Sequence, residues 1–288
     1  MKTRRNPFTG ELEDYPPPQT FLCPQDSRPS RETVSEALGF RAPQAFVEFA
    51  EHINKEARGD PYRCVDLFGE SLGIGAADGP TVYDSAPCEL FPIGYPGVDG
   101  VHFGYLVHAP EIDADDYPIC RFCPMDSDGV TIEGMDTYDG IASIMCFWGS
   151  ATIYPNTPQW DSAVDCARDK ERKPVPVKNA IQIPTDWRFE SSSDGVGVLA
   201  PLSLFSSDGF ITIDPYGPAE PFEQAAADAV QDGHLATALF YLREGYWHNW
   251  TEKPIGLARL LCDVYDKLNR QPLANVMRAR IDKWAEDA

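Results

Sequence analysis

Apolar residues recur at helical spacing near the start of the chain. One set, which begins at Phe46, stands at i, i+3, i+4 and i+7, and this spacing predicts the buried face of an amphipathic helix. Pro43 suits the first position of this helix, where no backbone N–H is needed. Just before it, Thr33 and Glu36 have the spacing of a capping box, which predicts a shorter helix. The apolar face of the longer helix comprises Phe46, Phe49, Ala50 and Ile53.

The pattern changes to a period of two residues within 87–134, and this alternation predicts strands. Glycine, proline and aspartate between the apolar runs predict turns. We therefore expect an antiparallel meander, closed by a helix over 139–148 where helical spacing returns. Further strands are expected at 117–122 and 130–132. The clearest strand has one apolar face, which consists of Val101, Phe103, Tyr105 and Val107.

Two other regions lack a sustained period. Residues 61–86 hold four glycines in quick succession, and we expect a flexible loop there. They do not complete a G-x-G-x-x-G phosphate loop, because Asp78 occupies the third glycine position. Residues 151–220 contain short apolar runs cut by prolines, which predict strands and loops with a charged linker at 165–176. Whether these strands extend the first sheet or form their own stays open.

Helical spacing returns in 221–288, where Pro254 and Pro272 can each start a helix. The similar junctions at 232–236 and 270–274 predict two helical hairpins that resemble tetratricopeptide units. Two such units bury little surface alone, so we expect them to pack on the β part. Three apolar faces follow one another: Leu235, Ala238, Leu239 and Leu242; Leu261, Val264, Tyr265 and Leu268; and Leu273, Val276, Met277 and Ile281.

Together these elements predict an α+β fold with a mostly antiparallel sheet flanked by helices. We expect an extended N-terminal arm (1–29), an α+β domain (31–150), a β and loop extension (151–220) and a C-terminal helical region (221–288). The arm begins with basic residues like a signal peptide, but a polar, proline-rich stretch follows instead of an apolar core. No apolar run approaches the roughly 20 residues of a membrane helix, and we expect a cytoplasmic protein without membrane contact.

Charge narrows the classes of partner. The chain has 45 acidic and 24 basic residues, a formal net charge of −21. Phosphates repel such a surface, so the charge argues against nucleic-acid binding. It favours fast, salt-sensitive association with a basic protein, although plain solubility explains it equally well.

Metal chemistry has weak support in the sequence. Cys120 and Cys123 form a C-x-x-C pair, but no second pair completes a zinc site. In a strand these two side chains point to opposite faces. Asp126 and Asp128 resemble the start of a calcium loop, yet Gly129 arrives too early for one, so we expect a tight turn. We predict no cofactor, and the eight dispersed cysteines are expected to be reduced, buried thiols.

Acidic residues gather between 111 and 139. They would repel one another on a single surface, a cost that a cationic partner relieves. Alternatively, they belong to separate solvated turns on different faces, and both interpretations stay open. The nine acids are Glu111, Asp113, Asp115, Asp116, Asp126, Asp128, Glu133, Asp136 and Asp139, with Arg121 as the single base among them.

Several short motifs within 31–150 resemble the SMI1/KNR4 (SUKH) superfamily. The chain has an early helix, a strand that reads Glu-Leu-Phe-Pro-Ile-Gly over 89–94, a Gly-Val-Asp-Gly turn at 97–100, and Phe-Gly-Tyr at 103–105. Tyr-Pro-Ile at 117–119 follows. The resemblance covers about 40% of the chain, and the region after 150 has no counterpart in a minimal domain of that family. It implies an α+β fold. In bacteria it implies an immunity protein that binds and neutralises a polymorphic toxin, often a nuclease.

We therefore expect a non-enzymatic binding protein whose partner is a basic toxin domain. One alternative is a scaffold that recruits a partner through its C-terminal helices; exposed apolar surface on 235–281 would favour it. A second alternative is a metal-dependent enzyme built on Asp126, Asp128 and the cysteine pair. The expected partner-binding residues are Tyr95, Asp99, Phe103, Tyr105, Asp113, Asp115, Asp116, Asp126 and Asp128.

Overall fold

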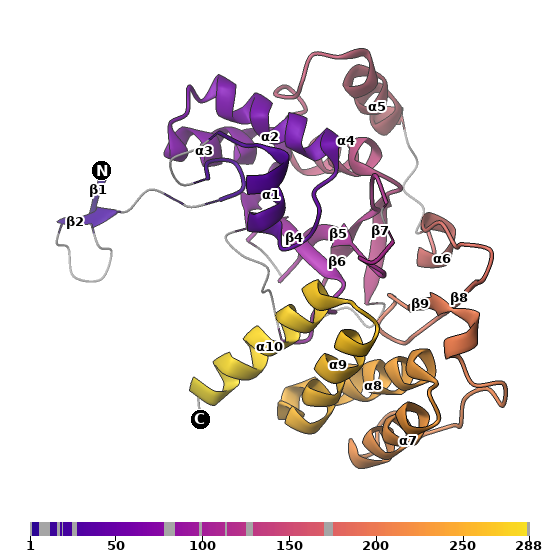
Figure 1. Cartoon of the computed structure of the whole chain (residues 1–288). Coiled ribbons are helices and arrows are strands. Elements are labelled where there is room, and N and C mark those ends of the chain that lie inside the picture. Colours follow the sequence, from indigo (N-terminus) through magenta and orange to yellow (C-terminus); the bar gives the residue numbers. More distant parts are fainter. Residues whose placement is uncertain are drawn as a thin grey trace.

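The computed structural model has the predicted α+β architecture, with helices around a central sheet and a helical C-terminal region (Figure 1). The structure describes residues 2–5, 12–15, 18, 20–24, 28–77, 84–97, 100–112, 114–124, 129–169 and 175–286, and for 2–5 and 12–15 the backbone alone.

Three helices precede the sheet, where the sequence predicted two and a loop. The two predicted helices are present, and the four apolar residues named for the longer one are buried. The loop prediction for 61–86 is wrong in its first half, because 61–72 are helical. Asp60 caps this helix through bonds to the N–H groups of Tyr62 and Arg63, and Pro61 occupies its first turn. The helices are α1 (Arg31–Leu38), α2 (Gln44–Glu56) and α3 (Pro61–Leu72).

The expected meander is confirmed as a five-stranded sheet. Its strands follow one another in chain order and each pairs antiparallel with the next. The strands are β3 (Gly75–Ala76), β4 (Leu90–Tyr95), β5 (His102–Leu106), β6 (Ile119–Phe122) and β7 (Val130–Gly134). The predicted closing helix is α4 (Thr137–Trp148), which Asp136 caps.

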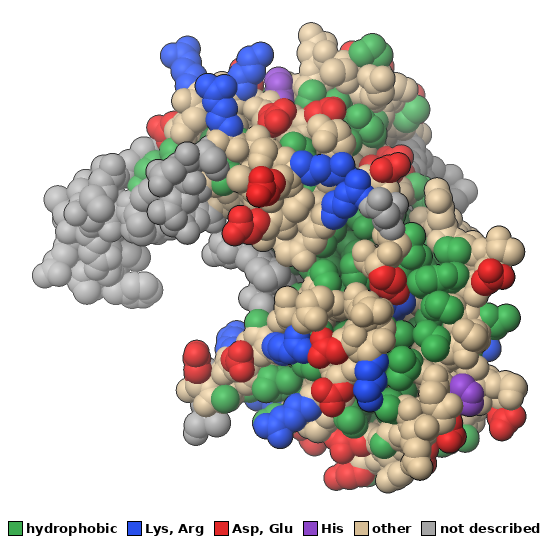
Figure 2. All heavy atoms as spheres, in the orientation of Figure 1, with side chains coloured by type: hydrophobic (Ala, Val, Ile, Leu, Met, Phe, Trp, Pro, Cys, Tyr) green, Lys and Arg blue, Asp and Glu red, His purple; other side chains and the backbone are tan. Residues whose placement is uncertain are grey.

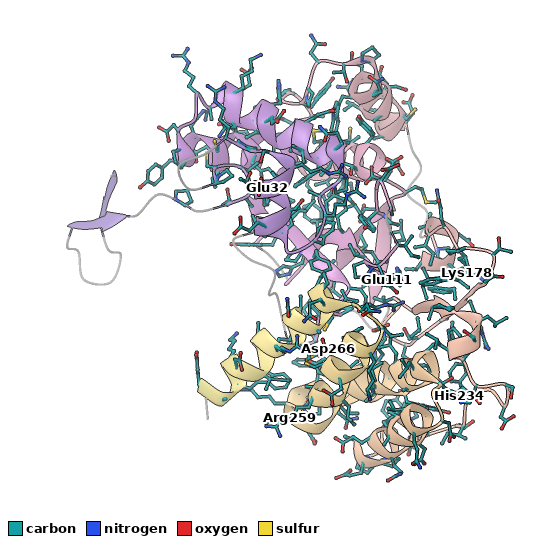
Figure 3. The ribbon with its side chains drawn as sticks, viewed as in Figure 1. Glu32, Glu111, Lys178, His234, Arg259 and Asp266 are labelled. Carbon is teal, nitrogen blue, oxygen red and sulfur yellow. The ribbon has the colours of Figure 1, made fainter. Side chains whose placement is uncertain are left out.

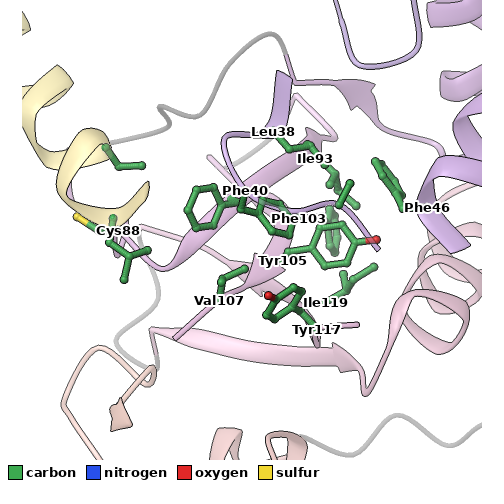
Figure 4. Close-up of a cluster of buried hydrophobic side chains, with 14 of the residues drawn as sticks. Leu38, Phe40, Phe46, Cys88, Ile93, Phe103, Tyr105, Val107, Tyr117 and Ile119 are labelled. Carbon is green, nitrogen blue, oxygen red and sulfur yellow. The ribbon is translucent and has the colours of Figure 1, made fainter. Parts of the chain in front are cut away.

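One face of the sheet packs against the early helices and α4. Aromatic rings dominate this core: Phe40 lies 4.9 Å from Phe91 and 5.4 Å from Tyr105, and Phe46 meets Tyr105 edge-on. Figure 4 shows the same cluster reaching from Phe46 at one end to Cys88 beside a C-terminal helix. The central domain and the C-terminal helices therefore share one core.

The other face of the sheet is buried as well, which the sequence did not predict. Alternation in β5 indicated a single apolar face, but four of its five residues are buried. Residues after 174 supply the cover. The second core contains Leu90, Leu106, Cys120, Phe122, Val130 and Ile132 from the sheet with Val177, Ala180 and Val196 from the extension. Cys123 packs in the first core, so it and Cys120 lie on opposite sides, as predicted.

The extension forms a separate two-stranded sheet, which resolves the alternative left open above. Among the described residues, a bridge from Ile132 to Val175 and the bond from the N–H of Val130 to the carbonyl of Asp194 connect the extension to the main sheet. The linker predicted at 165–176 is wrong in its first part, because those residues end a helix whose Trp160 and Val164 are buried. The elements are α5 (Pro158–Asp169), α6 (Val177–Ala180), β8 (Trp187–Glu190), β9 (Val198–Pro201) and the 3-10 helix η1 (Leu202–Leu204).

The C-terminal region is helical, as predicted, and its helices pack as neighbours in chain order: α7 on α8, α8 on α9 and α9 on α10. It also packs on the β part, since α8 contacts β9. The elements are α7 (Glu220–Gln231), α8 (Leu235–Asn249), the 3-10 helix η2 (Trp250–Glu252), α9 (Ile255–Lys267) and α10 (Gln271–Glu286).

The predicted N-terminal arm contains a hairpin of β1 (Lys2–Arg5) and β2 (Leu12–Tyr15). Farther along, Phe21 and Leu22 are buried in the core. The Asn54 amide donates to the carbonyl of Leu22 (3.0 Å), and the thiol of Cys23 contacts that of Cys64. The end of the arm is thus part of the folded body.

Candidate functional site

The aromatic residues expected to contact a partner are mostly internal. Phe103 and Tyr105 are 0% exposed, and the Tyr105 hydroxyl bonds to Thr137 at 2.9 Å. Both belong to the core, so their expected place on a binding surface is corrected. Only Tyr95 is exposed, at 39%, and its ring lies 5.5 Å from that of His102. The alternation that identified the strand could not tell a core face from a contact face.

Of the six acids predicted to bind a partner, the structure describes two, Asp115 and Asp116. Asp115 is exposed. Asp116 accepts bonds from the N–H and hydroxyl of Thr137 and from the N–H of Tyr117, so it joins the segment before β6 to the start of α4. Burial raises the pKa of Asp116, and these hydrogen bonds oppose the shift. The remaining four, Asp99, Asp113, Asp126 and Asp128, lie outside the described residues.

Other acids of the 111–139 stretch also have partners within the molecule. Glu111 pairs with Arg270, and Glu133 with Arg121. Asp136 caps α4, and Asp139 accepts from the N–H of Met135. These described carboxylates therefore serve the fold, which favours the interpretation that the stretch is not one repelling surface.

The cysteine pair gives no sign of a metal site. Cys120 and Cys123 are buried on opposite sides of the sheet, and burial raises the pKa of Cys120. Among the described residues, no three potential ligands gather as a metal would require. All eight cysteines are free, but the expectation of buried thiols holds for six of them, since Cys146 is half-buried and Cys166 is exposed.

A buried charged cluster, which we call the junction cluster, joins the sheet to the C-terminal helices. Arg243 on α8 pairs with Glu89, at the start of β4, and with Asp194, in the β8–β9 turn. Tyr265 on α9 donates to Glu89 at 2.9 Å. All four side chains are at most 6% exposed. Charges removed from water this fully are tolerated because they are paired.

Local backbone geometry positions Asp194 in this cluster. Its carboxylate accepts from the N–H of Val196 (3.0 Å) and from the hydroxyl of Ser192. Its carbonyl accepts from the N–H of Val130, at the start of β7. Gly129 makes this approach feasible: its φ is +65°, and a Cβ there would lie 1.9 Å from the Asp194 carbonyl oxygen.

Two more polar contacts support the same junction. Arg270, at 1% exposure, makes a two-pronged pair with Glu111 at 2.9 Å and donates to the Leu199 carbonyl at 2.6 Å. Figure 3 shows Glu111 where the central domain meets the C-terminal helices. His108 donates to the Val196 carbonyl at 2.8 Å, and burial lowers its pKa to about 4. His108 is therefore a neutral structural donor.

The cavity at the junction is too small for an organic substrate. It measures about 20 Å³ and is lined by Ser85, Glu89, Arg243 and Arg280, among others. That volume accommodates about one water molecule. Burial raises the pKa of Cys88 beside it to about 12 and that of Tyr265 well above its usual range. Both groups therefore stay protonated near neutral pH, and the contacts of the cluster join the start of β4 to α8 and α9.

The junction cluster was missed at the sequence level, although a signal exists. Arg243 stands four residues after Leu239, on the apolar face of its helix, and Glu89 immediately precedes the apolar run of β4. A charged residue at a core position needs a buried partner. Which charges pair with each other could not be read from the sequence, because Glu89, Asp194 and Arg243 are far apart along the chain.

A second missed feature lies on the surface. From 189 to 242 the chain contains eight acids and neither lysine nor arginine. Asp208, Asp214, Glu220, Asp228 and Asp232 are exposed. Figure 2 shows acidic side chains around α7 at the lower edge of the molecule and hydrophobic side chains above them, over β8, β9 and α6. This face combines negative charge with exposed apolar groups.

Comparison of the chain with protein-family models and with curated proteins finds no match. None of the helices in the described part of the chain has the length and apolarity needed to cross a bilayer.

Proposed function

We propose that the protein is a non-catalytic binding protein that neutralises a basic protein partner, with a toxin domain as the partner that the SMI1/KNR4 resemblance implies. The observation that carries the proposal is a set of five exposed acids in a run, 189–242, that has no lysine and no arginine: Asp208, Asp214, Glu220, Asp228 and Asp232. A surface of one sign attracts a partner of the opposite sign and accelerates association.

The distribution of polar groups supports binding over catalysis. The buried ionisable residues described above are paired across the junction, around a cavity of about 20 Å³. Acids on the surface of α7 are accessible to a macromolecule. We therefore place the partner surface on residues 208–232 and not on the 111–139 stretch, where most described acids bond within the molecule.

The alternative of a groove between the C-terminal helices has less support. It requires exposed apolar surface on 235–281, but Leu242, Tyr265 and Met277 are at most 1% exposed. Among the large apolar side chains described in that span, Ile255 is the exposed one, at 43%. These helices use their apolar faces to form the core.

The test is capture of partners from the native host by the tagged full-length protein at low and high salt. A variant with Glu220, Asp228 and Asp232 changed to lysine reverses the charge at the three exposed acids on α7 and at its C-terminal end. The matched control changes Glu32, Glu36 and Glu51, which are exposed on α1 and α2, and alters the net charge equally. We expect a basic protein that is held at low salt, released at high salt and lost only from the α7 variant.

The captured protein is then assayed for toxicity with and without the wild-type chain. Suppression by the wild type but not by the α7 variant supports neutralisation. Equal capture by both variants, or partners that do not respond to salt, would contradict the proposed acidic contact.

A further inference from the structure

Residues 205–217 form a segment without helix or strand, which we call the strap, that runs along α8 (Figure 1). The N–H of Ser206 donates to the hydroxyl of Thr237 at 2.8 Å, and the N–H of Ile211 to that of Tyr241 at 2.6 Å. The Tyr216 ring lies 6.0 Å from that of His248. The contacts extend along α8 from Thr237 to His248, which is about 17 Å at the rise of an α-helix.

Aromatic packing fixes the strap in place. Phe205 is buried, and the Phe210 ring lies 4.1 Å from that of Phe240 on α8, with the two rings tilted by 39°. The guanidinium of Arg188, on β8, lies over the rings of Phe205, at 4.9 Å, and Phe210, at 5.6 Å. A partner would therefore meet a surface that is already ordered, and a preorganised surface loses little entropy on binding.

The strap and the residues before it expose apolar groups that the core does not use. Eight large apolar side chains are exposed among the described residues, and four of them lie between 183 and 216. Ile211 is 63% exposed, Leu202 58% and Tyr216 92%. These side chains offer a partner apolar groups that are not used in the core.

Acids accompany these apolar groups. Asp208 and Asp214 are exposed on the strap itself, and α7 follows directly with Glu220. The Asp208 carboxylate bonds to the hydroxyl of Ser207, and that of Asp214 to the N–H of Tyr216. Both donors are neutral, so the negative charge remains available to a cationic partner.

We propose that the strap, together with Leu202, is the docking surface for an amphipathic basic segment of the protein partner, which places apolar side chains on Ile211 and Tyr216 and lysine or arginine beside Asp208 and Asp214. The charge complementarity selects this occupant over a neutral apolar one. The inference rests on the proposed function and specifies which part of the acidic face makes contact.

The test uses a synthetic helical peptide of leucine and lysine with all leucines on one face, and a scrambled peptide of the same composition. Fluorescence anisotropy measures the Kd of each for the full-length protein. Hydrogen exchange locates the contact. We expect the amphipathic peptide to bind at least about tenfold tighter than the scrambled one, with protection centred on 205–217.

Two double variants make the test specific. Ile211→Ser with Tyr216→Ser removes the exposed apolar groups of the strap and should weaken peptide binding about tenfold. Met135→Ser with Phe147→Ser removes two exposed apolar groups near α4 and should leave the Kd unchanged. Equal binding of both peptides, equal losses in both variants, or protection elsewhere would overturn the inference.

The two proposals can fail separately. If the α7 lysine variant loses the native partner but the Ile211 and Tyr216 variant retains it, the charge-based function stands and the strap is not the docking surface. If neither variant affects capture, both proposals fail.

Discussion

At the scale of single residues, the most informative side chains are charged ones in the core. Arg243 is 4% exposed and faces Glu89 and Asp194, each from a different part of the chain. Buried ions contribute little net stability as a pair, but each becomes costly when its partner is removed. The junction cluster therefore makes the folded state depend on all three residues together.

Replacing Arg243 with methionine should lower the free energy of unfolding by about 3–5 kcal/mol, because two buried carboxylates lose their counter-charge. Urea unfolding followed by circular dichroism measures this. Arg63→Met is the matched control: it breaks the exposed pair with Glu70 and should hardly change the midpoint. Adding Glu89→Gln and Asp194→Asn to Arg243→Met should recover part of the loss. No recovery would show that packing, not unpaired charge, causes it.

His108 should make the protein less stable in mild acid. Its pKa is about 4 in the fold against an ordinary 6.5, since burial disfavours the charged ring. The unfolded chain therefore binds the proton first, and stability falls as the pH drops from about 6.5 towards 4. The full effect is about 3 kcal/mol. Nearby charges are Glu89, Arg243 and Arg270.

The check is the free energy of unfolding at several pH values for the wild type and for His108→Gln, whose amide can still donate to the Val196 carbonyl. The variant should lose less stability across this window. Parallel curves for the two proteins would assign the acid sensitivity to other groups.

At the scale of elements, local signals determined where most helices and strands lie. Helical spacing identified α1, α2 and α4, and alternation identified the meander. The expected capping box of Thr33 and Glu36 was wrong, because Ser30 caps α1 and Thr33 is the third residue of that helix. Pro43 precedes α2 and does not occupy its first position.

The glycines in and after α3 resemble those of a loop, although Asp60 and Pro61 signal the start of a helix. Gly69 lies inside the helix and Gly73 ends it, with a φ of +70°.

Asp60 should therefore matter to α3. Asp60→Ala removes the acceptor for two N–H groups and should cost about 1 kcal/mol, which denaturant unfolding can measure. Asp60→Asn keeps an accepting oxygen and should cost less. If both variants unfold like the wild type, packing alone defines the start of this helix.

At the scale of the whole molecule, the extension and the C-terminal helices complete the central domain. They cover the second face of the sheet and contribute Arg243, Tyr265 and Arg270 to the junction. The C-terminal helices pack through their apolar sides. Acids are exposed on α7 and on the strap, and apolar side chains are exposed on the strap. Binding is thus proposed for a face that the resemblance to a minimal SUKH domain does not cover.

The sequence by itself determined the fold class, most elements and the net charge, because capping, alternation and helical spacing are local properties of the chain. The tertiary structure alone decided that Phe103 and Tyr105 are core residues and that Asp116 joins the segment before β6 to α4. It also decided that Glu89, Asp194 and Arg243 meet. Burial and pairing depend on residues distant in sequence: the second face of the sheet is apolar only because residues after 174 cover it.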